Sequence, residues 1–307
     1  MTETPRAYRA ICFDLDGTLL PMDLGAFMQS YFEALYDFMT VRGIDGGAFL
    51  EALKRGTHAM AAHDDGSTNE EAFWGEFHRH MDPDAADWEA LLAEFYEGPF
   101  GKLGESVQPN PETARALEVL QEKGYPLVLT TMPMFPPQAV RWRLAWAGAD
   151  ADAFARLTTY DNSTTVKPHP RYYAENAAAL GVAPEDILMV GNNTVEDLAF
   201  AELGADAFLV TDWLLDPTDG FDLSTVRHGT MADFARWVEA LPPCANPARD
   251  INAGTVAAAD AEAVLAACAT AGDAQAAAAR YAAAKADAAP YPATPGADAA
   301  AGEEEVR

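Results

Sequence analysis

The chain alternates between short apolar runs and longer stretches whose apolar residues recur every three or four positions. Short runs between glycine, proline or polar residues are typical of buried strands, whereas the longer recurrence is typical of helices. Five short runs predict strands at residues 10–13, 127–131, 156–159, 187–190 and 207–210. From residue 111 onward the strands alternate with predicted helices, which indicates an α/β fold with a parallel sheet covered on both faces.

The segment from residue 20 to residue 108 lacks a convincing strand pattern. Its first helical stripe runs from Leu24 to Phe38, and three further stripes of apolar residues follow. Aromatic residues are frequent in these stripes and are interpreted mainly as core. We therefore predict a helical domain at 20–108, inserted into an α/β core formed by residues 1–19 and 109–245.

Composition changes after residue 245. Alanine dominates residues 257–289, and three prolines and an acidic run follow before the last residue. Alanine favours helix, but this segment offers few large apolar side chains for a core. We predict an Ala-rich C-terminal extension at 246–307, helical over 250–289 and disordered over 290–307.

The formal net charge of −28 limits the kinds of partner. Such a field repels phosphate backbones and anionic lipid, so we expect neither nucleic acid nor a membrane as a partner. The sequence contains no run of about 18 apolar residues, and its first residues lack the pattern of a secretory signal. The widely spaced cysteines suit a reducing compartment. These features predict a cytoplasmic protein and leave its oligomeric state open.

Two aspartates follow the first predicted strand in the pattern D-x-D-G-T, at Asp14 and Asp16. Residues two apart on an extended segment point the same way, so both carboxylates are expected in one small volume. Two carboxylates this close repel each other and need a cation or a shared proton. Ligands of parallel sheets bind beyond the carboxyl ends of the strands, and Thr131, Lys167 and Asn193 are predicted at the same edge.

These groups suit phosphoryl transfer, which depends mainly on positioning and on charge compensation. Asp14 is the candidate nucleophile, and its attack on phosphorus would give an aspartyl-phosphate. Asp16 is the candidate acid and base, which protonates the leaving oxygen and later deprotonates water. Lys167 would add positive charge and Thr131 a hydrogen bond. Mg²⁺, which prefers oxygen ligands, would let an anionic nucleophile approach an anionic phosphate.

The order of these motifs resembles the haloacid dehalogenase-like (HAD) superfamily over about residues 8–215. The resemblance implies a Rossmann-like core, a helical cap that closes over the site, and Mg²⁺-dependent hydrolysis of small phosphate esters. In that family's pattern, Asp14 matches the nucleophile and Asp16 the acid and base. Thr131 matches the phosphate-binding hydroxyl, with Thr130 as an alternative, and Lys167 matches the cation.

The metal ligands that the resemblance implies are Asp14, Asp16 and Asn193. The family usually has an aspartate where this chain has Asn193, and a neutral amide should bind Mg²⁺ more weakly. Asp197 matches the later acid of the same motif and is expected to support the site without contacting the metal. The dehalogenase branch lacks the second aspartate, so Asp16 favours the phosphatase branch.

Three functions remain open from the sequence. The first is an Mg²⁺-dependent phosphatase that acts on a small phosphorylated metabolite. The second is a catalytically weak or inactive HAD-like protein that binds a phosphorylated ligand or a protein partner, which Asn193 and the unusual C-terminal segment favour. The third is a phosphomutase, which shares the aspartyl-phosphate.

The identity of the substrate cannot be predicted from these motifs. In this architecture the cap and its linkers would select it, including Met22, Asp23 and the region of Phe73 and Trp74. Arg141 and Arg143 follow the second predicted strand, and both are interpreted as solvated helix positions, with a role toward an anionic substrate as the alternative.

Overall fold

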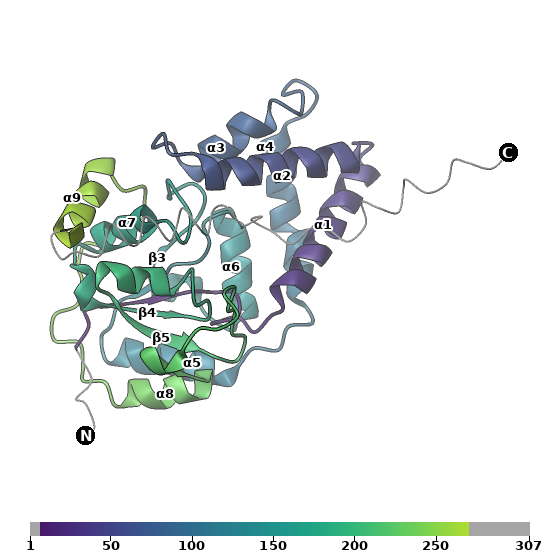
Figure 1. The fold of residues 1–307 in the computed structure, drawn as a ribbon. Coiled ribbons are helices and arrows are strands. Elements are labelled where there is room, and N and C mark those ends of the chain that lie inside the picture. Colours follow the sequence, from purple (N-terminus) through teal and green to yellow (C-terminus); the bar gives the residue numbers. More distant parts are fainter. Residues whose placement is uncertain (1–6, 270–307) are drawn as a thin grey trace.

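The computed structural model describes residues 7–269, which form a six-stranded parallel sheet flanked by helices (Figure 1). The strand order is β3-β2-β1-β4-β5-β6. The strands are β1 (Ala10–Phe13), β2 (Leu127–Leu129), β3 (Phe154–Leu157), β4 (Ile187–Gly191), β5 (Asp206–Val210) and β6 (Arg227–Gly229). The predicted α/β fold with a parallel sheet is confirmed.

Strand β1 lies in the middle of the sheet because it is apolar on both faces. Ile11 and Phe13 pack into the core on one face, whereas Ala10 and Cys12 pack into the core on the other. All four are fully buried. This alternation follows from the two-residue period of a strand, and a strand buried on both faces reads as one continuous apolar run.

Helices cover both faces of this sheet. One core cluster contains α5 (Pro111–Glu122), α6 (Pro137–Trp146) and α8 (Met231–Glu239). The other contains α7 (Pro170–Leu180), the 3₁₀ helix η4 (Leu198–Leu203) and α9 (Ala258–Ala269). Short 3₁₀ turns complete the connections: η2 (Ala151–Ala153), η3 (Pro184–Asp186) and η5 (Leu223–Thr225). No helix in the described part of the chain is long and apolar enough to cross a membrane.

A group of helices between β1 and α5 forms a second layer above the sheet edge (Figure 1). This helical unit comprises α1 (Leu24–Val41), α2 (Gly46–Ala62), α3 (Asn69–Phe77), α4 (Trp88–Glu97) and the 3₁₀ helix η1 (Pro99–Gly104). Each of its four α-helices begins after a residue whose side chain accepts a hydrogen bond from the first turn, which stabilises helix starts.

The helical unit is fixed to the core at the start of α3. The side-chain amide of Asn69 donates to the backbone oxygens of Pro133 and Thr165, at 2.9 and 3.1 Å. Asn69 is fully buried, so these bonds satisfy a polar group that would otherwise be costly to bury. The predicted domain limits at 20–108 and 109–245 stay predictions.

Some predicted elements differ from the structure. The third strand ends at Leu157 rather than continuing to 159, and β6 was not predicted because it is short and largely exposed. The helix predicted from residue 250 begins at Ala258. Arg156 accounts for that delay, because its guanidinium donates to the backbone oxygens of Asn252 and Gly254 and holds this stretch outside a helix. The part of the predicted extension from residue 270 to residue 307 lies outside the described residues.

Candidate active site

The turn after β1 brings the two aspartates of the D-x-D-G-T motif to the carboxyl edge of the sheet. Gly17 has φ of +81°, a conformation that side chains with a Cβ rarely adopt. A Cβ on Gly17 would lie 2.2 Å from Nδ2 of Asn192, in the loop after β4. Glycine is therefore required here both by the backbone conformation and by the close approach of the neighbouring loop.

Asp14 is held by one cation and one hydroxyl. Oδ1 of Asp14 lies 2.8 Å from Nζ of Lys167, and Oδ2 accepts a hydrogen bond from Thr18 at 3.2 Å. Burial lowers the pKa of Lys167, but the carboxylates of Asp14 and Asp197 raise it more, so the net shift is strongly upward. The lysine is thus a permanent positive charge beside the predicted nucleophile.

Asp197 joins this lysine to the loop after β4. Its Oδ1 lies 2.7 Å from Nζ of Lys167, and its Oδ2 accepts from the backbone N–H groups of Asn192 and Asn193 at 2.9 Å each. Burial raises the pKa of Asp197, and the charge of Lys167 opposes that shift. Asp197 therefore orients the lysine and the loop.

Asp16 forms an ion pair that was not expected from the sequence. Its Oδ2 lies 2.5 Å from Nη1 of Arg143 on α6. Arg143 is 1% exposed, and its guanidinium also lies 4.5 Å from the ring centroid of Phe135. Within residues 7–269, Oδ1 of Asp16 and the Nε and Nη2 atoms of Arg143 have no hydrogen-bond partner. These atoms can therefore form further hydrogen bonds at the site.

The interpretation of Arg143 as a solvated position is therefore wrong. The helical period could have indicated this burial. Arg143 follows the buried residues Ala139 and Val140 by four and three positions, so all three lie on the same face of α6. Arg141 is exposed and pairs with Asp152 at 2.8 Å, as a solvated helix position would. Burial raises the pKa of Asp16, the charge of Arg143 opposes this, and Asp14 adds to it.

The two candidate threonines after β2 have different surroundings. The hydroxyl of Thr130 donates to the backbone oxygen of Phe13 at 3.2 Å and contacts the sulfur of Met189. The hydroxyl of Thr131 is buried and has no partner in the described residues. Thr131 is thus the threonine whose hydroxyl remains available to a ligand.

The loop after β4 presents Asn192, rather than Asn193, to the aspartates. Oδ1 of Asn192 accepts from the same Thr18 hydroxyl that donates to Asp14, at 3.2 Å. The amide oxygen of Asn193 instead accepts from the backbone N–H groups of Val195 and Glu196, at 2.9 and 3.0 Å. No hydrogen bond in the described chain joins the side chain of Asn193 to either aspartate.

The oxygen donors at this site suit a hard cation. Asp14, Asp16 and Asn192 supply carboxylate and amide oxygens, and Oδ1 of Asp16 is buried without a partner. No group of three or more histidine, cysteine or acidic side chains within residues 7–269 is arranged to hold a metal by itself. Mg²⁺ is typically held by one or two carboxylates together with waters and substrate phosphate. The residues therefore fit an Mg²⁺ ion whose remaining coordination positions are filled by water and substrate.

Comparison with known proteins identifies a family that matches most of this chain. Residues 8–204 match a family model described as haloacid dehalogenase-like hydrolase. A phosphoglycolate phosphatase from Neisseria gonorrhoeae is 24% identical over 205 residues, which cover 66% of this chain and 80% of the relative.

Solved structures of low sequence identity are also similar. A HAD phosphatase from Thermococcus onnurineus is 22% identical, with a TM-score of 0.48 over 76% of this chain and 99% of that one. An L-2-haloacid dehalogenase from Xanthobacter autotrophicus is 16% identical, with a TM-score of 0.45 over 76% and 98%.

Proposed function

This chain belongs to the haloacid dehalogenase-like hydrolases, and we propose that it is a phosphatase of small phosphorylated metabolites. The observation that carries the proposal is the position of Asp14 beside Lys167, with Asp16 two residues further on and anchored to Arg143. This arrangement offers a carboxylate nucleophile, a second carboxyl group and two fixed cations at one edge of the sheet. The phosphatase name of the Neisseria gonorrhoeae relative supports the same reaction class.

In the proposed first step, an oxygen of Asp14 attacks phosphorus and the bond from phosphorus to the leaving oxygen breaks. Asp16 gives its proton to that oxygen, so the product leaves as a neutral alcohol. Lys167 offsets the charge of the phosphoryl group, and the free hydroxyl of Thr131 donates to one of its oxygens. Arg143 holds the Asp16 side chain in one orientation throughout.

In the second step, water attacks the phosphorus of the aspartyl-phosphate and Asp16 accepts its proton. The bond from phosphorus to the Asp14 oxygen breaks, which releases inorganic phosphate and restores both carboxyl groups. We propose that Asp14 and Asn192 hold Mg²⁺, which leaves Oδ1 of Asp16 free to carry the transferred proton. The bound ion would reduce repulsion between Asp14 and the phosphate. Asp197 positions Lys167 and the Asn192 loop without contacting substrate.

The helical unit is proposed to be the cap that covers this site. Its docking through Asn69, onto loops that follow β2 and β3, supports that role. The negative charge and the three free cysteines support a cytoplasmic location.

The proposal is tested with an aryl phosphate such as p-nitrophenyl phosphate, with and without Mg²⁺. We expect turnover by the unaltered protein and a loss of at least about 1,000-fold in Asp14→Asn, because the variant lacks the nucleophile. Asp37→Asn changes an exposed carboxylate on α1 and is the matched control. Full activity in Asp14→Asn contradicts the mechanism. Absence of turnover by the unaltered protein across a metabolite panel favours an inactive ligand-binding member instead.

A further inference from the structure

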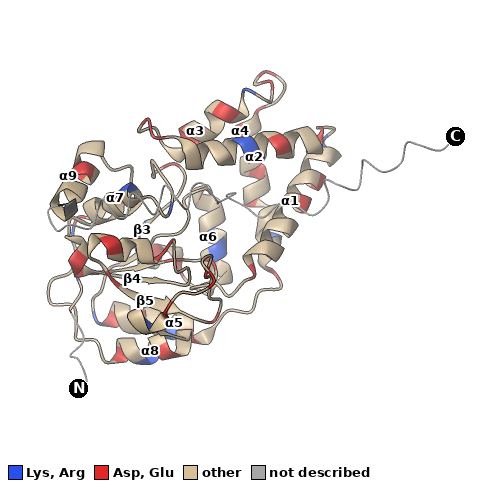
Figure 2. Ribbon diagram, in the orientation of Figure 1, with Lys and Arg blue, Asp and Glu red and all other residues tan. Residues whose placement is uncertain are grey.

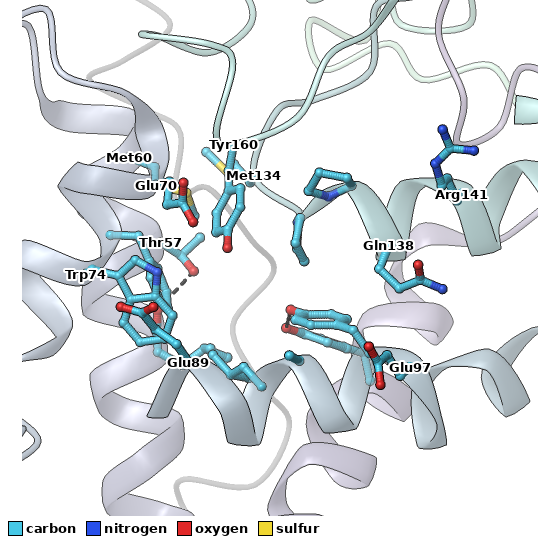
Figure 3. Close-up of a pocket in the computed structure, with 18 residues that line it drawn as sticks. Thr57, Met60, Glu70, Trp74, Glu89, Glu97, Met134, Gln138, Arg141 and Tyr160 are labelled. Carbon is cyan, nitrogen blue, oxygen red and sulfur yellow. Dashed lines mark hydrogen bonds between the residues drawn. The ribbon is translucent and has the colours of Figure 1, made fainter. Parts of the chain in front are cut away.

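A cavity of about 390 Å³ lies between the helical unit and the loops of the core (Figure 3). The helical unit contributes residues from all four of its α-helices, and the core contributes Met134, Gln138 and Tyr160 among others. Asp14 and Asp16 do not line it. The cavity is therefore distinct from the catalytic groups, although the loop that carries Met134 begins just after Thr131.

The walls of this cavity are rich in aromatic rings. Tyr31 and Tyr96 are stacked with ring centroids 6.5 Å apart, and their hydroxyls lie 2.7 Å from each other. Trp74 and Tyr160 also line the cavity (Figure 3). Aromatic faces carry negative electrostatic potential and attract cations, with tryptophan the most effective.

Three glutamates, Glu70, Glu89 and Glu97, also line the cavity. None of them forms an ion pair with a basic residue in the described chain. The basic residue in the lining, Arg141, is already paired with Asp152. Acidic residues outnumber basic ones across both layers of the molecule (Figure 2), so the wider field does not offset this charge.

Glu70 is joined to the core by a hydrogen bond. Its backbone N–H donates to the backbone oxygen of Tyr160 at 2.9 Å, which fixes its position at the joint between the two layers. Burial raises the pKa of its carboxyl group, the hydroxyl of Tyr160 opposes this by a hydrogen bond, and Asp161 and Glu89 add to the rise through their charges. A cation placed here would relieve that repulsion.

We propose that this cavity binds an organic ammonium group, held against the aromatic walls and neutralised by Glu70 and Glu89, which lie on the same side of the cavity in Figure 3. A neutral ligand would use the rings but leave the carboxylates without a counter-charge, and an anion would be repelled. The ammonium group belongs either to the alcohol part of the phosphate ester or to a separate small molecule. The first of these sources rests on the proposed phosphatase function, whereas binding of the cation does not.

Calorimetric titration of the whole protein with choline chloride tests the binding. The control ligand is 3,3-dimethylbutan-1-ol, which has the same shape without the charge. We expect choline to bind at least about fivefold more tightly than this alcohol, and the difference to shrink at high salt. Equal affinity for the two ligands, or no heat from choline at tens of millimolar, would overturn the proposal.

Variants then assign the binding to this cavity. Glu70→Gln and Glu89→Gln are each expected to weaken choline binding about fivefold, and Trp74→Leu to weaken it by a similar factor. Trp74 packs on Phe73 and Phe77, so the glutamine variants serve if Trp74→Leu does not fold. Glu94→Gln, on the same helix as Glu89 but outside the lining, removes an exposed ion pair with Arg42 and should leave the affinity for choline unchanged. Unchanged affinity in both glutamine variants contradicts the assignment.

Turnover separates the two sources of the ammonium group. If it belongs to the substrate, kcat/KM for phosphocholine exceeds that for glycerol 3-phosphate, and Glu70→Gln removes the difference. If it is a separate molecule, choline binds as above while the two esters are turned over alike. Because the calorimetric result needs no turnover, failure of the phosphatase proposal leaves the binding proposal testable by itself.

Discussion

Nη1 of Arg143 lies 2.5 Å from Oδ2 of Asp16, and the arginine side chain is almost completely buried. The pair joins α6 to the turn that follows β1. A buried ion pair of this kind is strongly destabilising to break from one side, because the remaining charge keeps its desolvation cost. It also fixes the direction of the carboxyl group that we assign to proton transfer.

Arg143→Met is expected to lower the free energy of unfolding by about 3–5 kcal/mol, because it leaves Asp16 without its counter-charge. Arg141→Met removes an exposed pair on the same helix and is expected to cost less than about 1 kcal/mol. Urea denaturation of both variants measures the difference. Equal losses would show that the Asp16 pair contributes no more than a surface pair.

Thr131→Val is expected to lower kcat/KM by about 100-fold, because it removes a hydroxyl that is free to donate to the phosphoryl group. Its stability should change little, since no protein partner is lost. Thr130→Val should show the reverse pattern: activity is kept, and about 1 kcal/mol of stability is lost with the bond to Phe13. Steady-state kinetics and thermal denaturation distinguish the two. The assignment fails if Thr130→Val is the variant that loses activity.

Asn192→Asp is expected to tighten Mg²⁺ binding about tenfold, because a carboxylate replaces an amide oxygen beside Asp14. The variant also loses the hydrogen bond from Nδ2 to Trp213, so its stability should fall. Asn193→Asp places the same charge where the side chain caps Val195 and Glu196, and should change Mg²⁺ affinity less than twofold. Titration calorimetry with MgCl₂ measures both without any substrate. A larger gain in Asn193→Asp would reassign the ligand.

Gly17→Ala tests the tight turn between the two aspartates and the Asn192 loop. Alanine in a left-handed conformation costs about 1–2 kcal/mol, and its Cβ would also collide with Asn192. Gly124→Ala carries only the first cost, because Gly124 has φ of +78° and no atom within 4 Å of its Cβ position. We expect Gly17→Ala to lower the free energy of unfolding by at least about 1 kcal/mol more than Gly124→Ala does. Equal losses would mean that the loop moves aside freely.

The local pattern of the sequence was sufficient for five of the six strands and for the order of the motifs. The apolar run at Ala10–Phe13 is buried on both faces, so it has the composition of a central strand and is recognised as one. The two aspartates follow directly, and the carboxyl edge of a parallel sheet is a binding edge wherever it occurs. Strand β6 was missed because its exposed residues carry no apolar pattern.

The tertiary structure decided which side chains meet. Arg143 pairs with Asp16 across 127 positions of the sequence, and only the packing of α6 against the core determines that its guanidinium reaches the turn. Asn192 and Asn193 are adjacent and chemically identical, and the bend of one loop decides which amide faces Thr18. The cavity between the two layers depends on how the helical unit docks. Local periodicity in the sequence indicates which residues are buried and where turns occur. Distances between side chains of distant segments are determined only when the helices and strands pack together.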